Sequence, residues 1–236
     1  MTKRPRGWGP QSTEAEDASR KDKSKSRPHY VAIEGPIGVG KTTLVGKLTK
    51  MFAGRMILEI VEENPFLSDF YDDQEKFAFQ TQLFFLLSRY RQQQELWQPD
   101  LFHPYIFSDY IFSKYRLFAS LTLSDNEMLL YDQVFHILDT RVLKPDLVVY
   151  LQARLDVLLD RIKRRGRPFE KDFNPDYLKR LCATYNDYFF HYADTPLLVV
   201  DTSDIDVVAS EEDLHDLNRA IMAHRGGVQF YKPLGR

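Results

Sequence analysis

Short apolar runs alternate with longer amphipathic segments along most of this chain. Residues 29–33 form the first run, which is partly β-branched and therefore favours a buried strand. Comparable runs at 56–61, 105–108, 147–151 and 197–201 predict four more strands. A helical period is clearest at 74–96, 126–143, 153–164, 175–191 and 211–224, and helix-forming residues also occupy 44–52.

Strands that alternate with helices are typical of an α/β protein whose parallel sheet is covered on both faces. The pattern predicts one domain over residues 28–236, with a five-stranded parallel sheet and no internal repeat. Ligands of such sheets gather at the carboxyl ends of the strands. The ligand-binding and catalytic residues are therefore expected in the segments that follow the strands.

Charge is distributed unevenly along the chain. Residues 1–27 contain eight Lys or Arg and four Asp or Glu, a net charge of +4, while the remainder has a net charge of −6. Residues 1–27 lack apolar periodicity, so we expect them to form a disordered, solvated tail. A basic arm that touches nucleic acid or another protein is the alternative.

Composition excludes several classes of protein. Hydrophobic residues make up 43% of the 236 positions, which is enough for a core and argues against global disorder. No apolar run reaches the roughly 18 residues of a membrane span, and no segment resembles a signal peptide. Cys182 is the single cysteine, which excludes a disulfide framework and suits the reducing cytoplasm.

The first predicted strand leads directly into a phosphate-binding loop (P-loop). The pattern Gly-x-x-x-x-Gly-Lys-Ser/Thr stands between a strand and a helix, as its chemistry requires. Backbone amides of such a loop and the positive end of the helix both point at phosphate oxygens. Lys41 is expected to reach the β- and γ-phosphates and the Thr42 hydroxyl to bind Mg²⁺, so the sequence predicts binding of a nucleoside triphosphate. The loop consists of Gly35, Pro36, Ile37, Gly38, Val39, Gly40, Lys41, Thr42 and Thr43.

An arginine cluster indicates the kind of reaction. Arg161 and Arg165 lie four residues apart on one helix face, and Gly166 ends that helix just before Arg167. Three guanidinium groups beside a P-loop suit the charge on transferring phosphoryl oxygens, which favours a kinase with an Arg-rich lid. A solvated basic helix end that complements the helix dipole is the alternative.

Further segments follow in a characteristic order: Glu63-Asn64-Pro65-Phe66, Phe79-Gln80-Thr81-Gln82, Ser88-Arg89-Tyr90-Arg91 and Ser108-Asp109-Tyr110. With the P-loop and the arginine cluster, they make residues 30–206 resemble the deoxyribonucleoside kinase family, especially its bacterial members that favour purines. Many kinases share the P-loop, but the ordered combination is more specific.

The resemblance implies roles for individual residues. The three arginines of the cluster would close over the ATP phosphates, and Glu170 would bind the 3′-hydroxyl of the sugar. Tyr71 lies eleven residues before Gln82, which matches the spacing between the family's sugar-binding tyrosine and its base-reading glutamine. Gln82 would then form hydrogen bonds with the nucleobase.

Helix geometry supports a substrate role for Gln82 independently. Gln82 and Arg89 are seven residues apart and face the same way on a helix, and Phe85 between them is a candidate for stacking on the base. The surrounding Phe and Leu residues make this helix apolar nearly all round, which predicts burial. Because buried polar side chains need partners, we favour a base-reading role for Gln82 and Arg89 over two ordinary surface residues.

A general base is required beside the 5′-hydroxyl of a nucleoside. Glu59, Glu62 and Glu63 all lie near the end of the second predicted strand. Family members often carry Glu-Pro-Val before an Asn-Pro pair, and alignment of that triplet with Glu59-Ile60-Val61 favours Glu59. Glu62 and Glu63 are the alternative candidates for the base. In the other interpretation, the glutamates at this strand end are solvated and have no catalytic role.

The segment Ser108-Asp109-Tyr110 departs from the family, much of which has an acid followed by Arg and Ser after the third strand. The resemblance implies that Asp109 takes part in Mg²⁺ binding through water. The charge of the missing Arg would come from the lid or from Arg89. Bulk and resemblance favour a purine, although Lys114, which cannot accept a hydrogen bond, stands near the position of the acid that often partners the base-reading Arg.

These features predict ATP-dependent phosphorylation of the 5′-hydroxyl of a deoxyribonucleoside, which would give the monophosphate for nucleotide salvage. The rivals are a nucleoside monophosphate kinase of the thymidylate kinase type and a nucleotide-sensing P-loop protein without turnover. The expected partners are the nucleoside and ATP, with neither nucleic acid nor membrane. Apolar surface on the helices at 74–96 and 126–143, together with the resemblance, predicts a homodimer.

Overall fold

The computed structural model describes residues 29–59, 64–97, 102–166, 174–207 and 210–232. A six-stranded sheet runs through its centre in the order β2-β3-β1-β4-β5-β6, and all neighbouring strands pair in parallel. The strands are β1 (Tyr30–Glu34), β2 (Arg55–Ile57), β3 (Ile106–Ser108), β4 (Leu147–Gln152), β5 (Leu197–Asp201) and β6 (Val228–Tyr231).

The central strands are buried along almost their whole length. Every residue of β1 is buried, as are residues 147–151 of β4 and 197–200 of β5. Continuous apolar runs of this kind are the sequence mark of parallel strands that helices cover on both faces. The α/β prediction is confirmed.

The prediction of five strands was wrong, because β6 adds a sixth. Val228, Gln229 and Phe230 of this edge strand are exposed, so its sequence lacks the apolar signature of a strand buried on both faces. Its backbone pairs in parallel with β5, so β6 covers the edge of β5 and becomes the edge strand itself. Its pairing runs from Leu197 opposite Val228 to Val200 opposite Tyr231.

The predicted helices are present, with ends that differ by a few residues. Two further helices, α3 and α5, were not predicted, because six and nine residues are too few to show a repeated helical period. The described helices are α2 (Lys41–Phe52), α3 (Leu67–Asp72), α4 (Gln74–Gln94), α5 (Lys114–Thr122), α6 (Asp125–Asp139), α7 (Leu155–Arg165), α8 (Pro175–Phe190) and α9 (Glu211–Ala223), with a 3₁₀ turn, η1 (Glu95–Trp97), after α4.

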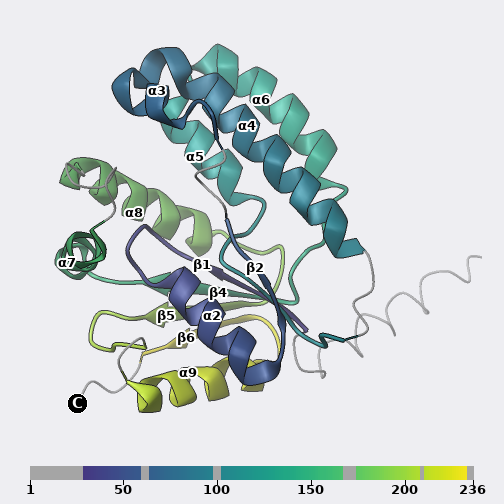
Figure 1. Ribbon diagram of the computed structural model, residues 1–236, viewed down its shortest axis with the longest axis vertical. Helices are drawn as coiled ribbons and strands as arrows, with labels where there is room; N and C mark the ends of the chain where they lie inside the picture. Colours follow the sequence, from purple (N-terminus) through teal and green to yellow (C-terminus); the bar gives the residue numbers. More distant parts are fainter. Residues whose placement is uncertain (1–28, 60–63, 98–101, 167–173, 208–209, 233–236) are drawn as a thin grey trace, which may run out of the picture.

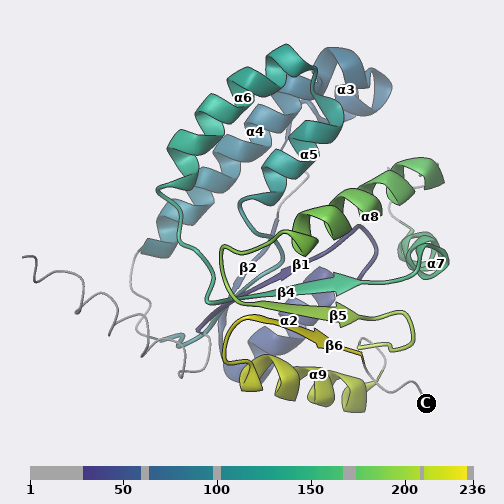
Figure 2. The same cartoon turned by 180° about the vertical axis from the view of Figure 1, so that it is seen from behind.

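Helices lie on both faces of the sheet. Helix α2 lies in front of the strands in Figure 1, and in both views α8 lies above the strands and α9 below them (Figures 1 and 2). Tyr150 of β4 stacks on Phe189 of α8 with ring centroids 4.2 Å apart, which anchors α8 to the sheet. Helices α3, α4, α5 and α6 form a separate group beyond α8 (Figure 1). Among the described helices, none has the length and apolar character of a membrane span.

The strand order decides where the functional segments meet. Because β3 lies between β2 and β1, the segments that follow these three strands emerge side by side at one edge of the sheet. Those segments contain the P-loop, Glu59 and Asp109. The sequence singled out these segments, and the sheet brings them together.

Candidate active site

The P-loop joins β1 to α2 and is pressed against α7. Gly38 has φ +85°, and a Cβ atom there would lie 2.8 Å from Cγ1 of Ile162 and 2.9 Å from the carbonyl oxygen of Leu158. A side chain would therefore clash with α7, and the left-handed backbone favours glycine as well. Helix α2 begins at Lys41, directly after the loop, so its N-terminal amides face the phosphate site.

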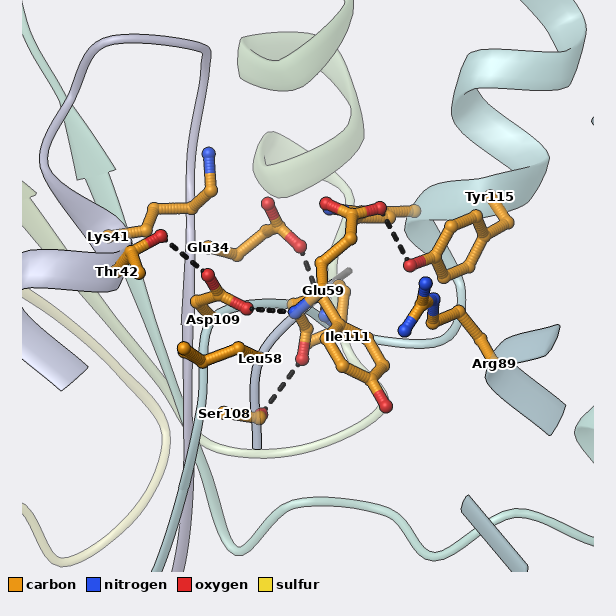
Figure 3. Close-up of polar contacts among 12 residues, drawn as sticks. Glu34, Lys41, Thr42, Leu58, Glu59, Arg89, Ser108, Asp109, Ile111 and Tyr115 are labelled. Atoms are coloured by element: carbon orange, nitrogen blue, oxygen red, sulfur yellow. Dashed lines mark hydrogen bonds and ion pairs between the residues drawn. The ribbon is translucent and has the colours of Figure 1, made fainter. Parts of the chain in front are cut away.

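Lys41 and Thr42, the P-loop residues expected to contact phosphate and metal, form hydrogen bonds with other groups of the protein. The Lys41 ammonium donates hydrogen bonds to the carbonyl oxygens of Gly35 and Pro36, at 2.7 and 3.2 Å. The Thr42 hydroxyl donates to Oδ2 of Asp109 at 2.6 Å. Asp109 is buried, and its Oδ1 accepts a hydrogen bond from the backbone amide of Glu59 at 2.8 Å (Figure 3).

Glu59 is held by a donor at each of its carboxylate oxygens. Oε1 accepts a hydrogen bond from the Tyr115 hydroxyl at 2.8 Å, and Oε2 accepts one from the Lys114 ammonium at 2.5 Å. Burial by itself would raise the pKa of Glu59, but the adjacent Lys114 ammonium and the hydrogen bonds lower it below its ordinary value. The carboxylate is therefore charged and oriented before any substrate binds.

Lys114 is the least expected member of the site. Only 4% of its side chain is exposed, and burial by itself would lower its pKa. The carboxylates of Glu59 and Glu34 outweigh that effect and raise the pKa above its ordinary value. Lys114 and Glu59 thus form an ion pair inside the protein.

Glu34, at the end of β1, is a buried acid that the sequence analysis missed. Its carboxylate accepts hydrogen bonds from the amides of Gly35 and Ile111, at 2.9 and 3.0 Å, and from the Tyr185 hydroxyl at 3.0 Å (Figure 3 shows the Ile111 contact). Burial raises its pKa. A signal was present, because an acid that ends an otherwise apolar strand directly before a P-loop is unlikely to be solvated.

A cavity of about 850 Å³ lies over the carboxyl ends of the strands. Its walls combine the P-loop, Glu59, one face of α4, the start of α5 and the facing ends of α7 and α8. The residues that line it are Ile37, Gly38, Val39, Gly40, Lys41, Thr42, Thr43, Glu59, Leu67, Phe70, Gln74, Thr81, Gln82, Phe85, Asp109, Tyr115, Phe118, Arg161, Arg164, Arg165, Asn174, Tyr177, Arg180, Asp206 and Val207.

Of the three residues expected to contact the base, two line the cavity and one does not. Gln82 and Phe85 both line the cavity, and Gln82 Nε2 donates to the Thr122 hydroxyl at 3.2 Å. Arg89 is buried, as the apolar helix predicted, but it is not among the described residues of the cavity wall. Its guanidinium donates to Oε1 of Gln92 at 3.0 Å (Figure 3 shows Arg89 beside Glu59 and Tyr115). Burial raises the pKa of the Tyr115 hydroxyl well above its ordinary value, and the nearby positive charge of Arg89 only partly opposes that effect.

The arginine cluster lies on the cavity wall beside the P-loop, where the Arg161 guanidinium donates to the Val39 carbonyl oxygen at 3.5 Å. Arg161 donates hydrogen bonds to the Thr202 hydroxyl at 3.1 Å and to the carbonyl oxygens of Thr202 and Ile205 at 2.9 and 3.0 Å. It therefore ties α7 to the segment after β5. Arg165 also lines the cavity, as does Arg164, which the sequence analysis passed over and which pairs with Asp160 at 2.7 Å.

Several predicted residues lie outside the described part of the chain. They are Glu62, Glu63, Arg167, Glu170, the tail at 1–27 and the side chain of Tyr71, whose backbone belongs to α3. Their proposed roles stay predictions.

Known proteins resemble this chain over most of its length. The family model described as "Deoxynucleoside kinase" matches residues 31–224. The chain is 40% identical to the deoxyguanosine kinase of Bacillus subtilis (strain 168) over 158 residues, which cover 66% of this chain and 76% of that protein. It is 31% identical to the deoxyguanosine kinase of Lactobacillus johnsonii over 203 residues, which cover 82% and 91%.

Solved structures show the same fold. The deoxyadenosine kinase of M. mycoides with bound dATP superimposes with a TM-score of 0.69 at 26% identity, covering 80% of this chain and 99% of that one. Since the family model spans most of the chain, the resemblance found in the sequence is confirmed. The chain belongs to the deoxynucleoside kinase family.

Proposed function

We propose that this protein transfers the γ-phosphoryl group of ATP to the 5′-hydroxyl of a purine deoxyribonucleoside. The observation that carries the proposal is that Lys41 and Thr42 of the P-loop, Glu59, and Gln82 with Phe85 all line the same cavity. A triphosphate and a nucleoside can meet there beside a carboxylate. The relatives named deoxyguanosine and deoxyadenosine kinases support the purine.

The donor side of the cavity is built for a triphosphate. The P-loop amides, the start of α2 and the arginines of α7 surround it with positive charge. A bound triphosphate offers Lys41 charged oxygens, which form stronger hydrogen bonds than the loop carbonyls that it contacts in this structure. Arg161, Arg165 and Arg167 would form the lid over these phosphates.

Thr42 and Asp109 fit a Mg²⁺ ion. The Thr42 hydroxyl and the Asp109 carboxylate are oxygen ligands of the type that Mg²⁺ prefers, and they already lie in contact beside the phosphate site. When bound, Mg²⁺ would supply positive charge that neutralises the phosphates of ATP. Asp109 would also keep Glu59 in place through the bond that it accepts from the Glu59 amide.

Glu59 is the proposed base on the acceptor side. As the 5′-oxygen bonds to the γ-phosphorus, the bond to the β–γ bridging oxygen breaks and ADP leaves. The proton of the 5′-hydroxyl passes to the Glu59 carboxylate. Gln82 would form hydrogen bonds with the base, Phe85 would stack on it, and Tyr71 and Glu170 would bind the sugar. The product would enter nucleotide salvage, for which we propose the cytoplasm.

We also propose a homodimer. Leu129 and Ile137 of α6 are 66% and 61% exposed, and Leu130 and Leu87 are exposed as well. Helices α4 and α6 lie side by side at the outer end of the molecule in both views (Figures 1 and 2). Apolar surface of this kind is typical of a two-fold interface.

A kinase assay with MgATP tests the proposed function. The substrates are the four common deoxynucleosides and their monophosphates, and Lys41→Met serves as the inactive control. We expect turnover of deoxyadenosine or deoxyguanosine. Turnover of the monophosphates alone would identify a nucleoside monophosphate kinase, and nucleotide binding without any turnover would identify a sensor.

A further inference from the structure

Lys114 occupies a position that is unfavourable for a lysine. It is the first residue of α5, where the helix dipole is positive, and its side chain is almost fully buried. A buried ammonium needs a compensating anion and complete hydrogen bonding. Packing alone would be served better by an apolar side chain, so the charge itself requires an explanation.

The ammonium of Lys114 is directed at one oxygen of Glu59. It bonds Oε2, while the neighbouring Tyr115 hydroxyl bonds Oε1, so consecutive residues of α5 hold the two oxygens. The rings of Tyr115, Phe118 and Tyr110 surround the ammonium at 5.5, 5.9 and 6.0 Å from their centroids. These cation–π contacts stabilise the ammonium and restrict its movement.

The two carboxylate oxygens of Glu59 differ in the position of the residue that bonds them. Tyr115 lines the cavity, whereas Lys114 is not among the described residues of its wall. Oε2 is thus anchored from inside the protein, and Oε1 is bonded by a residue of the cavity wall. A carboxylate oxygen accepts more than one hydrogen bond, so Oε1 has room for a substrate hydroxyl beside or in place of Tyr115.

We propose that Lys114 is a positioning residue for phosphoryl transfer, which anchors Oε2 of Glu59 so that Oε1 faces the 5′-hydroxyl. This inference rests on the proposed function. The proton of the hydroxyl goes to Glu59, and Lys114 keeps its own proton throughout. Misplacement of a reacting group by about 1 Å can cost about 10²-fold in rate, which sets the size of the expected effect.

A double-mutant cycle between Lys114 and Glu59 tests this role. Lys114→Met should lower kcat about 10²-fold and leave KM for the nucleoside nearly unchanged, since the residue touches no substrate. Lys114→Arg should recover most of the rate, because it restores a charged donor. In a Glu59→Gln background, Lys114→Met should have little further effect on kcat.

The control is Arg116→Met, on the same helix. Arg116 pairs with Asp132 at the surface, at 2.7 Å, and its removal should leave kcat and KM unchanged. Lys114→Leu, which also lacks a donor for Oε2, replaces the Met variant in the cycle if thermal unfolding shows that the latter does not fold.

Three results would overturn the inference. They are an equal loss of kcat in both backgrounds, a rise in KM with unchanged kcat, and an Arg variant as slow as the Met variant. Wild-type protein without deoxynucleoside kinase activity would overturn the proposed function as well. An active wild type with additive substitutions would overturn the role of Lys114 alone.

Discussion

At the scale of single residues, the surroundings of Glu59 are assembled from distant parts of the chain. Tyr110 stands where much of the family has Arg, and its hydroxyl donates to Oε1 of Gln92 at 2.8 Å. The sequence predicts that the lid or Arg89 supplies the missing positive charge. Lys114 delivers such a charge from α5, and Arg89 lies close enough to act on Glu59 as well.

Replacement of the proposed base should separate chemistry from binding. Glu59→Gln keeps the shape and an oxygen acceptor but can no longer take the proton, so kcat should fall about 10²- to 10⁴-fold with a modest change in KM. Steady-state kinetics with the preferred deoxynucleoside measure this. Glu62→Gln and Glu63→Gln should stay near wild type. If either collapses while Glu59→Gln remains active, the base is misassigned.

At the scale of elements, β6 depends on a buried histidine at the end of α9. His224 Nε2 contacts the carbonyl oxygen of Leu197 on β5 at 3.3 Å, and Nδ1 accepts a hydrogen bond from the amide of Gly226 at 3.2 Å. A ring that donates at Nε2 and accepts at Nδ1 is neutral. His224 therefore links α9, the turn before β6 and the neighbouring strand.

This link should weaken in mild acid. Burial lowers the pKa of His224 in the folded protein below 6.5, its ordinary value. The unfolded chain then binds a proton more readily, so stability is complete above pH 6.5 and is lost as the pH falls through the two pKa values. Melting temperatures from about pH 7.5 to about pH 5.5 measure the loss.

His224→Gln should reduce this acid sensitivity, because it removes the proton-binding ring. His215, which is exposed on the same helix, offers the matched control, and His215→Gln should keep the wild-type dependence. Equal dependence in all three proteins would contradict the assignment.

At the scale of the whole molecule, the sheet and the outer helices have different roles. The carboxyl edges of β1, β2 and β3 present the chemical groups, and α4, α5 and α8 surround them. The far sides of α4 and α6 do not contribute to the cavity and carry the exposed apolar residues. The cavity face of α4 is thus separate from the exposed apolar residues of α4 and α6, which form the proposed dimer surface.

The proposed homodimer should dissociate when charge is placed on α6. The double substitution Leu129→Glu and Ile137→Glu would bury two carboxylates in the interface, so we expect a monomer by sedimentation velocity. Phe230→Glu, at an 80% exposed position on β6, should leave the dimer intact. A wild-type protein that sediments as a monomer, or a double variant that remains dimeric, would contradict this interface.

The P-loop motif, the α/β class and the family can all be read from the chain without the structure. The P-loop consists of neighbouring residues, and its Gly-Lys-Thr order dictates which groups meet the phosphates whatever surrounds them. Buried strands and long helices likewise carry their own apolar periods. These features depend on local spacing, which is written directly in the chain.

Three features depend on the packing of the whole chain: the residues that face Glu59, the position of Arg89, and the addition of β6 to the sheet. Lys114 reaches Glu59 across 55 positions, and Tyr185 reaches Glu34 across 151, because strand order and helix packing place them together. Helix spacing placed Gln82 and Arg89 on one face but did not show which of them reaches the cavity. Such contacts join distant residues through packing, which local patterns do not encode.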